Sequence, residues 1–205
     1  MRLQHHPRGF TLLELLVGMA IFTIVLAAVY LMYWTSHTTF TRGRTKIDIQ
    51  QHARVALETM AREIRMAGYD PSTPPVIPAQ PVGFTQAMQT AGGSDIQFIA
   101  DVEGTGTAQR VRYLLVGNQI RREISTNAGG AAWNAAAISE LADKVKIDDP
   151  VNNPGLRFTY LDASDVATAT LANIRRVTIV VRIEEPAGRT TETARLDTDV
   201  RLRNL

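Results

Sequence analysis

Cysteine is absent from this sequence of 205 residues. Disulfide scaffolds, zinc–thiolate sites and cysteine nucleophiles are therefore excluded. All 4 histidines lie before residue 53, so the rest of the chain cannot supply a catalytic histidine. We also find no Ser/His/Asp set, no cluster of metal ligands and no glycine-rich phosphate loop. We therefore expect no catalytic residues, no metal, no cofactor and no enzymatic activity.

A large excess of one charge is also missing. The chain has 22 Lys+Arg and 20 Asp+Glu, and Arg2 and Arg8 account for the formal charge of +2. A general nucleic-acid-binding surface would show a clear excess of basic residues. We therefore expect no nucleic-acid partner.

Proline does not occur between Pro7 and Pro71, which leaves this stretch free to form an uninterrupted helix. Within it, residues 10–34 (FTLLELLVGMAIFTIVLAAVYLMYW) contain a single charge, on Glu14. A helix made of the 20 residues from Leu15 to Trp34 would be about 30 Å long, which is the thickness of the hydrocarbon core of a bilayer.

This apolar segment has three interpretations: a buried core helix, a secretory signal peptide or a membrane span. Core helices and signal peptides usually have shorter apolar runs, and a signal peptide ends at a small-residue cleavage site. Here Ala27 and Ala28 are followed by further apolar residues up to Trp34. We therefore favour a membrane-spanning helix. The charges on its two sides do not decide its orientation.

The helical pattern continues beyond the apolar segment, over residues 35–68. Apolar residues recur there at helical spacing and form one face: Ile49, Ala53, Ala56, Leu57, Met60, Ile64 and Ala67. Gly68 and Pro71 then supply a stop. We therefore predict one helix from about residue 10 to 67, with an amphipathic second half.

The pattern changes again after this helix. Residues 69–94 are rich in proline and are predicted to form a long loop, and residues 95–205 to form an antiparallel sheet. The expected strands have apolar residues at alternate positions: Ile96, Phe98, Ala100 and Val102; Val111, Tyr113 and Leu115; Leu156, Phe158 and Tyr160; Val177, Ile179, Val181 and Ile183; Leu196, Val200 and Leu202. Gly117-Asn118 is a predicted tight turn. The fold class is therefore α+β, with the long helix covering the apolar side of the sheet.

The most informative residues precede the apolar segment: Gly9-Phe10-Thr11-Leu12-Leu13-Glu14, after the short basic stretch 1–9. They resemble the class III signal of type IV pilins and pseudopilins. The resemblance implies that prepilin peptidase removes the leader 1–9 by cutting between Gly9 and Phe10, and that Phe10 becomes N-methylated. It also implies a subunit that waits in the inner membrane, N-terminus cytoplasmic and headgroup periplasmic, before it enters a filament.

Glu14 is a carboxylate in an otherwise apolar segment. A lone carboxylate at the centre of a bilayer would cost about 3 kcal/mol or more. The resemblance implies that Glu14 pairs with the new amine of Phe10, on the same chain or on a neighbour, and sets the register during assembly. The alternative is a glutamate that only caps the N-terminus of the helix.

Residues 46–205 resemble PilW-type minor pilins and J-type minor pseudopilins in their order of long helix, proline-rich loop and sheet. The resemblance implies a type IV pilin-like fold and a minor pilin that enters or primes a pilus. Its partners would be other major and minor pilins, the pilus assembly platform and inner-membrane lipid. The alternatives are a minor pseudopilin of type II secretion and a membrane-tethered binding module or adhesin.

Other candidate sites have simpler explanations. Four aspartates could offer oxygen ligands to calcium, but their spacing fits no defined loop and we interpret them as solvated turn residues: Asp148, Asp149, Asp162 and Asp165. The pairs Arg121-Arg122 and Arg175-Arg176 are interpreted as strand-face charges rather than as DNA ligands.

Overall fold

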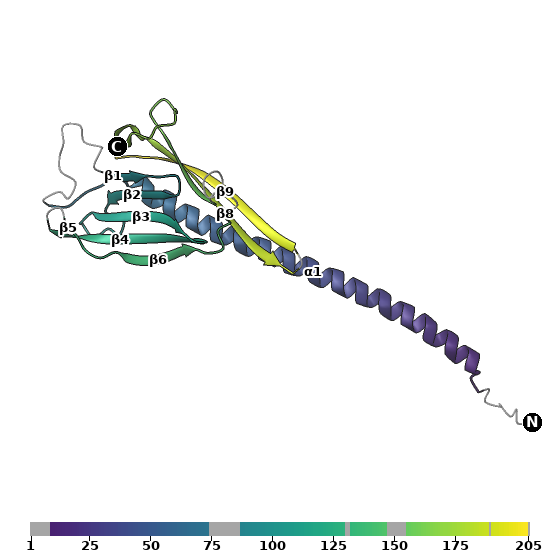
Figure 1. Ribbon diagram of the computed structural model, residues 1–205. Helices are drawn as coiled ribbons and strands as arrows, with labels where there is room; N and C mark the ends of the chain where they lie inside the picture. Colours follow the sequence, from purple (N-terminus) through teal and green to yellow (C-terminus); the bar gives the residue numbers. More distant parts are fainter. Residues whose placement is uncertain (1–8, 74–86, 130–131, 147–154, 189, 205) are drawn as a thin grey trace, which may run out of the picture. The chain divides into compact units, whose positions relative to one another are not determined.

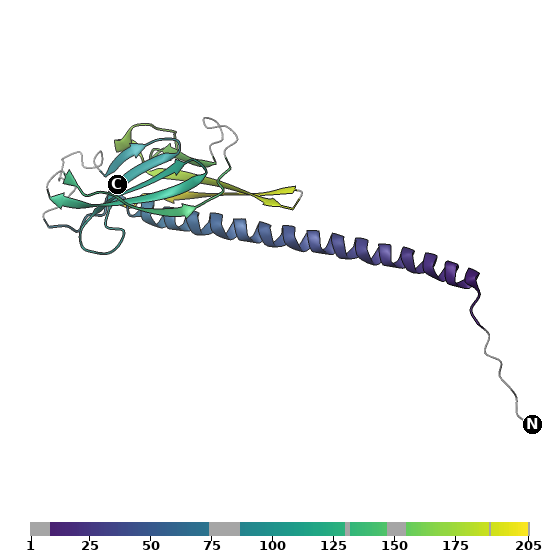
Figure 2. The same ribbon diagram turned by 60° about the horizontal axis from the view of Figure 1, so that its bottom comes forward.

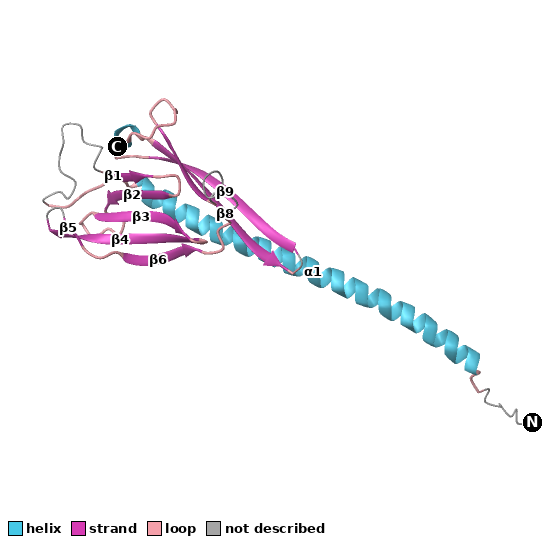
Figure 3. Cartoon of the chain, in the orientation of Figure 1, coloured by secondary structure: helices cyan, strands magenta, loops and turns pink. Residues whose placement is uncertain are grey.

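The computed structural model describes residues 9–73, 87–129, 132–146, 155–188 and 190–204. The chain divides into two compact units, Met1–Arg44 and Thr45–Leu205. One α-helix, α1 (Leu12–Arg65), supplies residues to both units, and the strands lie in the second unit (Figures 1 and 3). The architecture is α+β and consistent with a type IV pilin-like fold, as predicted.

The ends of α1 have local causes. Its first residue is Leu12, because Thr11 caps the helix and already lies outside it. The α-helix ends at Arg65 and a turn follows, in which Gly68 has a φ of 85°. The backbone N–H of Gly68 donates to the carbonyl of Ile99 at 2.9 Å. Glycine takes up this left-handed conformation at little cost, as is usual just beyond a helix.

Six strands of the second unit form the first antiparallel sheet: β1 (Met88–Ala91), β2 (Asp95–Ala100), β3 (Gln109–Val116), β4 (Gln119–Gly129), β5 (Ala132–Trp133) and β6 (Ala137–Ala142). Their order is β1-β2-β3-β4-β5, and β6 also pairs with β4. The predicted turn at Gly117-Asn118 is confirmed, since it joins β3 to β4 with Val116 opposite Gln119 and Gly117 at a φ of 58°.

A second antiparallel sheet contains β7 (Leu156–Leu161), β8 (Arg176–Ala187) and β9 (Thr190–Arg201), in that order. A short 3-10 helix at Leu171–Asn173 lies between β7 and β8 in the chain. The prediction of one sheet is therefore wrong in this respect. Alternating apolar residues define a face of each strand but not its neighbours. The two sheets meet where the backbone N–H of Phe158 donates to the carbonyl of Gly93 at 2.7 Å.

Strand β1 is a second departure from the prediction, because it lies within the segment 69–94 that was expected to be a loop. Its sequence, Met-Gln-Thr-Ala, has no strong preference for a strand. It becomes a strand by antiparallel pairing with β2, with an irregular register after Met88. Residues 74–86, which are half of the expected loop, lie outside the described residues.

A single hydrophobic cluster joins the second half of α1 to both sheets. Figure 2 shows the strands alongside this half of the helix. All seven predicted residues of the apolar helix face are buried, at 0–4% exposed. The inward residues of β2, β3, β7 and β8 complete the cluster, including Phe98, Tyr113, Phe158 and Ile179. The predicted faces of these strands are therefore confirmed. On β9, Val200 is buried and Leu196 is partly buried, while the charged residues between them face solvent.

Candidate processing and assembly site

The residues that carry the predicted processing signal lie at the start of α1. Gly9 and Phe10 precede the helix and are exposed, Phe10 at 90%. A Cβ atom added to Gly9 would meet no heavy atom within 4 Å. The fold therefore places no steric demand for glycine at this position, so a requirement for glycine would have to come from an enzyme that acts there.

Thr11 and Glu14 form a capping box at the first turn of α1. The backbone N–H and the hydroxyl of Thr11 both donate to Glu14 Oε2, each at 3.0 Å. In return, the backbone N–H of Glu14 donates to Thr11 Oγ1 at 3.2 Å. This reciprocal arrangement satisfies N–H groups that have no partner within the helix.

The capping box bears directly on the two interpretations of Glu14. The uncut chain shows the capping arrangement, with the carboxylate turned back toward the backbone of Thr11. Thr11 follows Phe10, so a new amine on Phe10 would lie one residue from the group that now binds Glu14. Capping and pairing with the amine are thus compatible, and the pairing stays a prediction.

The helix that follows is long and apolar enough to cross a membrane, and it is the one such helix among the described residues. Its apolar side chains are exposed over the whole stretch from Leu12 to Trp34. Two hydroxyl groups of this helix form hydrogen bonds with its own backbone, because Thr23 and Thr35 donate to the carbonyls of Met19 and Leu31, each at 2.8 Å. Such internal hydrogen bonds remove the cost of placing a hydroxyl in lipid.

A buried polar network in the second unit was not predicted. Glu63 is 4% exposed and accepts a hydrogen bond from the hydroxyl of Tyr113 at 2.5 Å. The guanidinium of Arg122 donates to both carboxylate oxygens of Glu63, at 3.0 and 2.8 Å. The sequence could have indicated this network, because Glu63 falls on the apolar face of the helix, next to Met60, Ile64 and Ala67. A charge on such a face needs a partner.

Burial and charge in this network both act on its titratable groups. Burial, followed by the charge and the hydrogen bond of Glu63, raises the pKa of Tyr113, so its hydroxyl stays protonated and donates. Burial disfavours the charge on Arg122, but the hydrogen bonds and charge of Glu63 outweigh this and raise the pKa of Arg122. The network therefore joins α1 to β4 through an ion pair and to β3 through a hydrogen bond.

The other predicted residues are held in simple structural roles. Asp162 accepts backbone N–H groups of Ser164 and Val166 at 2.8 and 3.0 Å, and Asp165 lies 3.2 Å from Arg176. Asp148 and Asp149 lie outside the described residues. Over the described part of the chain, no three acidic or histidine side chains come together as a possible metal site.

Comparison with known proteins identifies a family motif at the start of the chain, where α1 begins. Residues 5–30 match the family described as the prokaryotic N-terminal methylation motif, the signal of type IV pilins and pseudopilins. The predicted resemblance to this signal is thereby confirmed. No curated protein matches the chain.

The motif supports a type IV pilin or pseudopilin, and its family is one of structural subunits. It implies processing by prepilin peptidase and assembly with other pilins. With the apolar helix, it fits a membrane-anchored pilin.

Proposed function

We propose, starting from the type IV pilin signal at residues 5–30, that this protein is a minor type IV pilin that enters a pilus or primes its assembly. The observation that carries the proposal is that this signal extends into an apolar helix whose side chains are exposed from Leu12 to Trp34. Such a surface requires lipid or other subunits to cover it.

In this proposal, prepilin peptidase cuts between Gly9 and Phe10 at the cytoplasmic face of the inner membrane. The exposure of both residues supports access by an enzyme. The new amine of Phe10 is then methylated. The helix remains in the membrane as a single span, and the headgroup lies in the periplasm until the subunit is extracted into the filament.

Glu14 is the proposed assembly residue. In the membrane its carboxylate is satisfied by Thr11, which lowers the cost of keeping it there. When apolar helices of several subunits pack together, an amine at Phe10 offers a charged partner for it. Glu14 would then favour one register between neighbouring helices. Other major and minor pilins and the pilus assembly platform are the proposed partners.

Two sequence features support a minor subunit over a major one. The membrane half of α1 contains no proline and the chain contains no cysteine, whereas many major pilins have a proline there and a C-terminal cysteine pair. A minor pseudopilin of type II secretion has the same signal and is the alternative. A membrane-tethered binding module would keep the anchor but would not enter a filament.

Mass spectrometry of the protein from its native cells tests the proposal. We expect a mature N-terminus at N-methylated Phe10 and, in cells that lack prepilin peptidase, retention of residues 1–9. An intact Met1 in normal cells would contradict the proposal. A cut near Ala28 would also contradict it and would indicate an ordinary signal peptide.

A further inference from the structure

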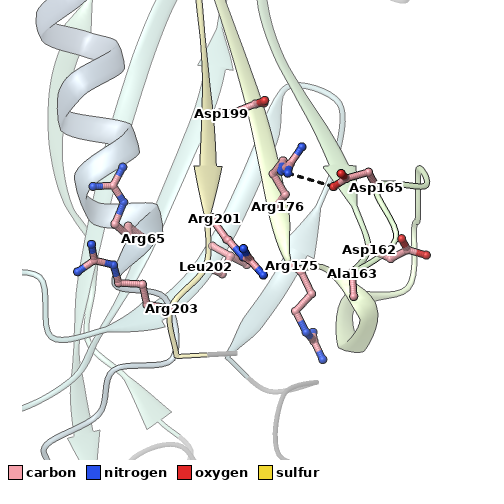
Figure 4. Close-up of a pocket in the computed structure, with 10 residues that line it drawn as sticks. All are labelled: Arg65, Asp162, Ala163, Asp165, Arg175, Arg176, Asp199, Arg201, Leu202 and Arg203. Carbon is pink, nitrogen blue, oxygen red and sulfur yellow. Dashed lines mark ion pairs between the residues drawn. The ribbon is translucent and has the colours of Figure 1, made fainter.

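The second unit contains an open hollow of about 890 Å³ (Figure 4). It lies between the end of α1, the start of β8 and the end of β9. Five arginines line it, together with three aspartates, Ala163 and Leu202: Arg65, Arg175, Arg176, Arg201 and Arg203 with Asp162, Asp165 and Asp199. They come from α1, from the start of β8, from the end of β9 and from the segment after β7. Arginines distant in the sequence are thus gathered in one place, although the chain after its basic leader is formally neutral.

The chain's last described residues are fixed beside the other arginines by specific contacts. The backbone N–H of Leu202 donates to the carbonyl of Arg175 at 3.0 Å, and the Leu202 side chain is 5% exposed. The side-chain amide of Asn204 donates to the carbonyl of Met66 at 3.4 Å. These contacts hold Arg201 and Arg203 on the exposed side of the segment, next to the end of α1.

The aspartates of the hollow already have partners. Asp165 pairs with Arg176, as the dashed line in Figure 4 shows. Asp199 accepts the hydroxyl of Thr178 at 2.5 Å, and Asp162 accepts two backbone N–H groups. By contrast, Arg65, Arg201 and Arg203 are exposed, and their guanidinium groups make no ion pair or hydrogen bond within the described residues. Three guanidinium groups are therefore available to an anionic partner.

From this arrangement we propose that the hollow binds a carboxylate-bearing segment of another protein. A guanidinium is planar and binds a carboxylate through two parallel hydrogen bonds. Arg201 is the last residue of β9 and Arg203 lies two positions beyond it, so their Cα atoms are at most roughly 7 Å apart. Acidic residues at alternate positions of an extended segment match this spacing.

The lining favours a protein partner over nucleic acid. Phosphates along a nucleic-acid backbone form a continuous row of negative charge, which the exposed carboxylates of Asp165 and Asp199 would repel. A protein segment with acidic residues at alternate positions can place its carboxylates against the arginines and keep neutral residues opposite these aspartates. No aromatic side chain lines the hollow, so it offers no platform on which bases could stack.

A binding measurement on the full-length chain in uncharged detergent tests this proposal without requiring a filament. The probes are a fluorescent Glu-Thr-Glu-Thr-Glu peptide, the same peptide with glutamine at each glutamate, and a short DNA duplex. The test variant is Arg201→Gln with Arg203→Gln. The matched control is Arg157→Gln with Arg195→Gln, which removes the same charge from exposed positions outside the hollow.

We expect the glutamate peptide to bind with an affinity that falls with salt, and the glutamine peptide not to bind. The test variant should bind about tenfold more weakly, whereas the control variant should bind as the unchanged chain does. Equal losses in both variants, or no binding to the unchanged chain, would overturn the proposal. Tighter binding of DNA than of the peptide, lost in the test variant, would also overturn it. Because none of these results depends on N-terminal processing, failure here leaves the proposed pilin function untouched.

Discussion

At the scale of single residues, burial decides which carboxylates matter to stability. Glu63 and Asp101 are 4% and 2% exposed, and each carboxylate accepts several hydrogen bonds. Removing one partner of a buried ion pair leaves the other charge uncompensated, which is strongly destabilising. Pairs at the surface contribute little, because water screens them. The two kinds of carboxylate should therefore respond very differently to the same substitution.

The Glu63→Gln variant tests this difference. It leaves the half-buried guanidinium of Arg122 without a negative partner, and we expect a loss of about 2–4 kcal/mol in the free energy of unfolding. The control is Glu185→Gln, which removes the carboxylate that pairs with Lys144 near the surface and should cost less than about 1 kcal/mol. Thermal unfolding of the full-length chain, followed by circular dichroism, measures both. Equal losses would contradict the role given to burial.

Asp101 makes the headgroup sensitive to acid. Burial alone would raise its pKa, but hydrogen bonds from the backbone N–H groups of Gly106 and Thr105, and from the Gln109 amide, outweigh this effect and lower the pKa below the ordinary value of 3.8. Because the folded state favours the charged form, the carboxylate stabilises the fold above pH 3.8. This stabilisation is lost as the pH falls through the lower, folded-state pKa.

Substitution of Asp101 by asparagine tests this pH dependence. We expect Asp101→Asn to be less stable than the unchanged chain at neutral pH, and the difference to shrink below a pH of about 4. Unfolding temperatures measured from pH 7 down to pH 3 report the difference. Asp197→Asn, at an exposed position on β9, is the control. A difference that stays constant down to pH 3 would show that the carboxylate charge is not the cause.

At the scale of elements, α1 joins two segments with different physical requirements. Its first half exposes apolar residues in every direction, whereas its second half buries one face in the headgroup core. Only the second half obtains its stability from packing within the same chain. Side chains on its two faces should therefore differ sharply in their effect on folding.

Two alanine substitutions on the second half of α1 test this division. Met60 is 0% exposed, and Met60→Ala should cost about 2–5 kcal/mol because it leaves a cavity. Val55 is 57% exposed, and Val55→Ala should change the free energy of unfolding by less than about 0.5 kcal/mol. The unfolding midpoint of each full-length variant measures the effect. Similar midpoints for both variants would mean that the apolar face does not pack as described.

At the scale of the whole molecule, the exposed apolar helix and Glu14 together predict assembly. Glu14→Leu makes the segment more apolar, so membrane insertion should be unchanged. Incorporation into sheared filaments should fall about tenfold or more, because the proposed partner of the Phe10 amine is gone. Immunoblots of the membrane and sheared fractions measure both quantities.

Glu58→Leu is the matched control for this experiment, since it makes the same chemical change at an exposed position outside the apolar segment. It should leave both fractions unchanged. Normal incorporation of the Glu14→Leu variant would contradict the assembly role. Absence of the unchanged chain from sheared filaments would favour a static membrane anchor.

Local sequence determined the parts of this protein that depend on neighbouring residues. The methylation motif, the apolar segment, the buried face from Ile49 to Ala67 and the turn at Gly117-Asn118 could all be predicted. The last three depend on the periodicity or the conformational preferences of residues that are close in the chain. The motif and the candidate site at Gly9, Phe10 and Glu14 were predicted from the resemblance of these residues to the type IV pilin signal, whereas the capping role of Thr11 required the structure.

Tertiary structure decided which distant segments became partners. The division into two sheets, the pairing of β1 with β2, the ion pair of Glu63 with Arg122 and the gathering of arginines around Arg65 join residues far apart in the chain. Alternating apolar residues show that a strand has a buried face, but they do not say which strand lies beside it. A charged residue likewise does not reveal its partner, because that depends on which side chains the folded backbone brings within hydrogen-bonding distance.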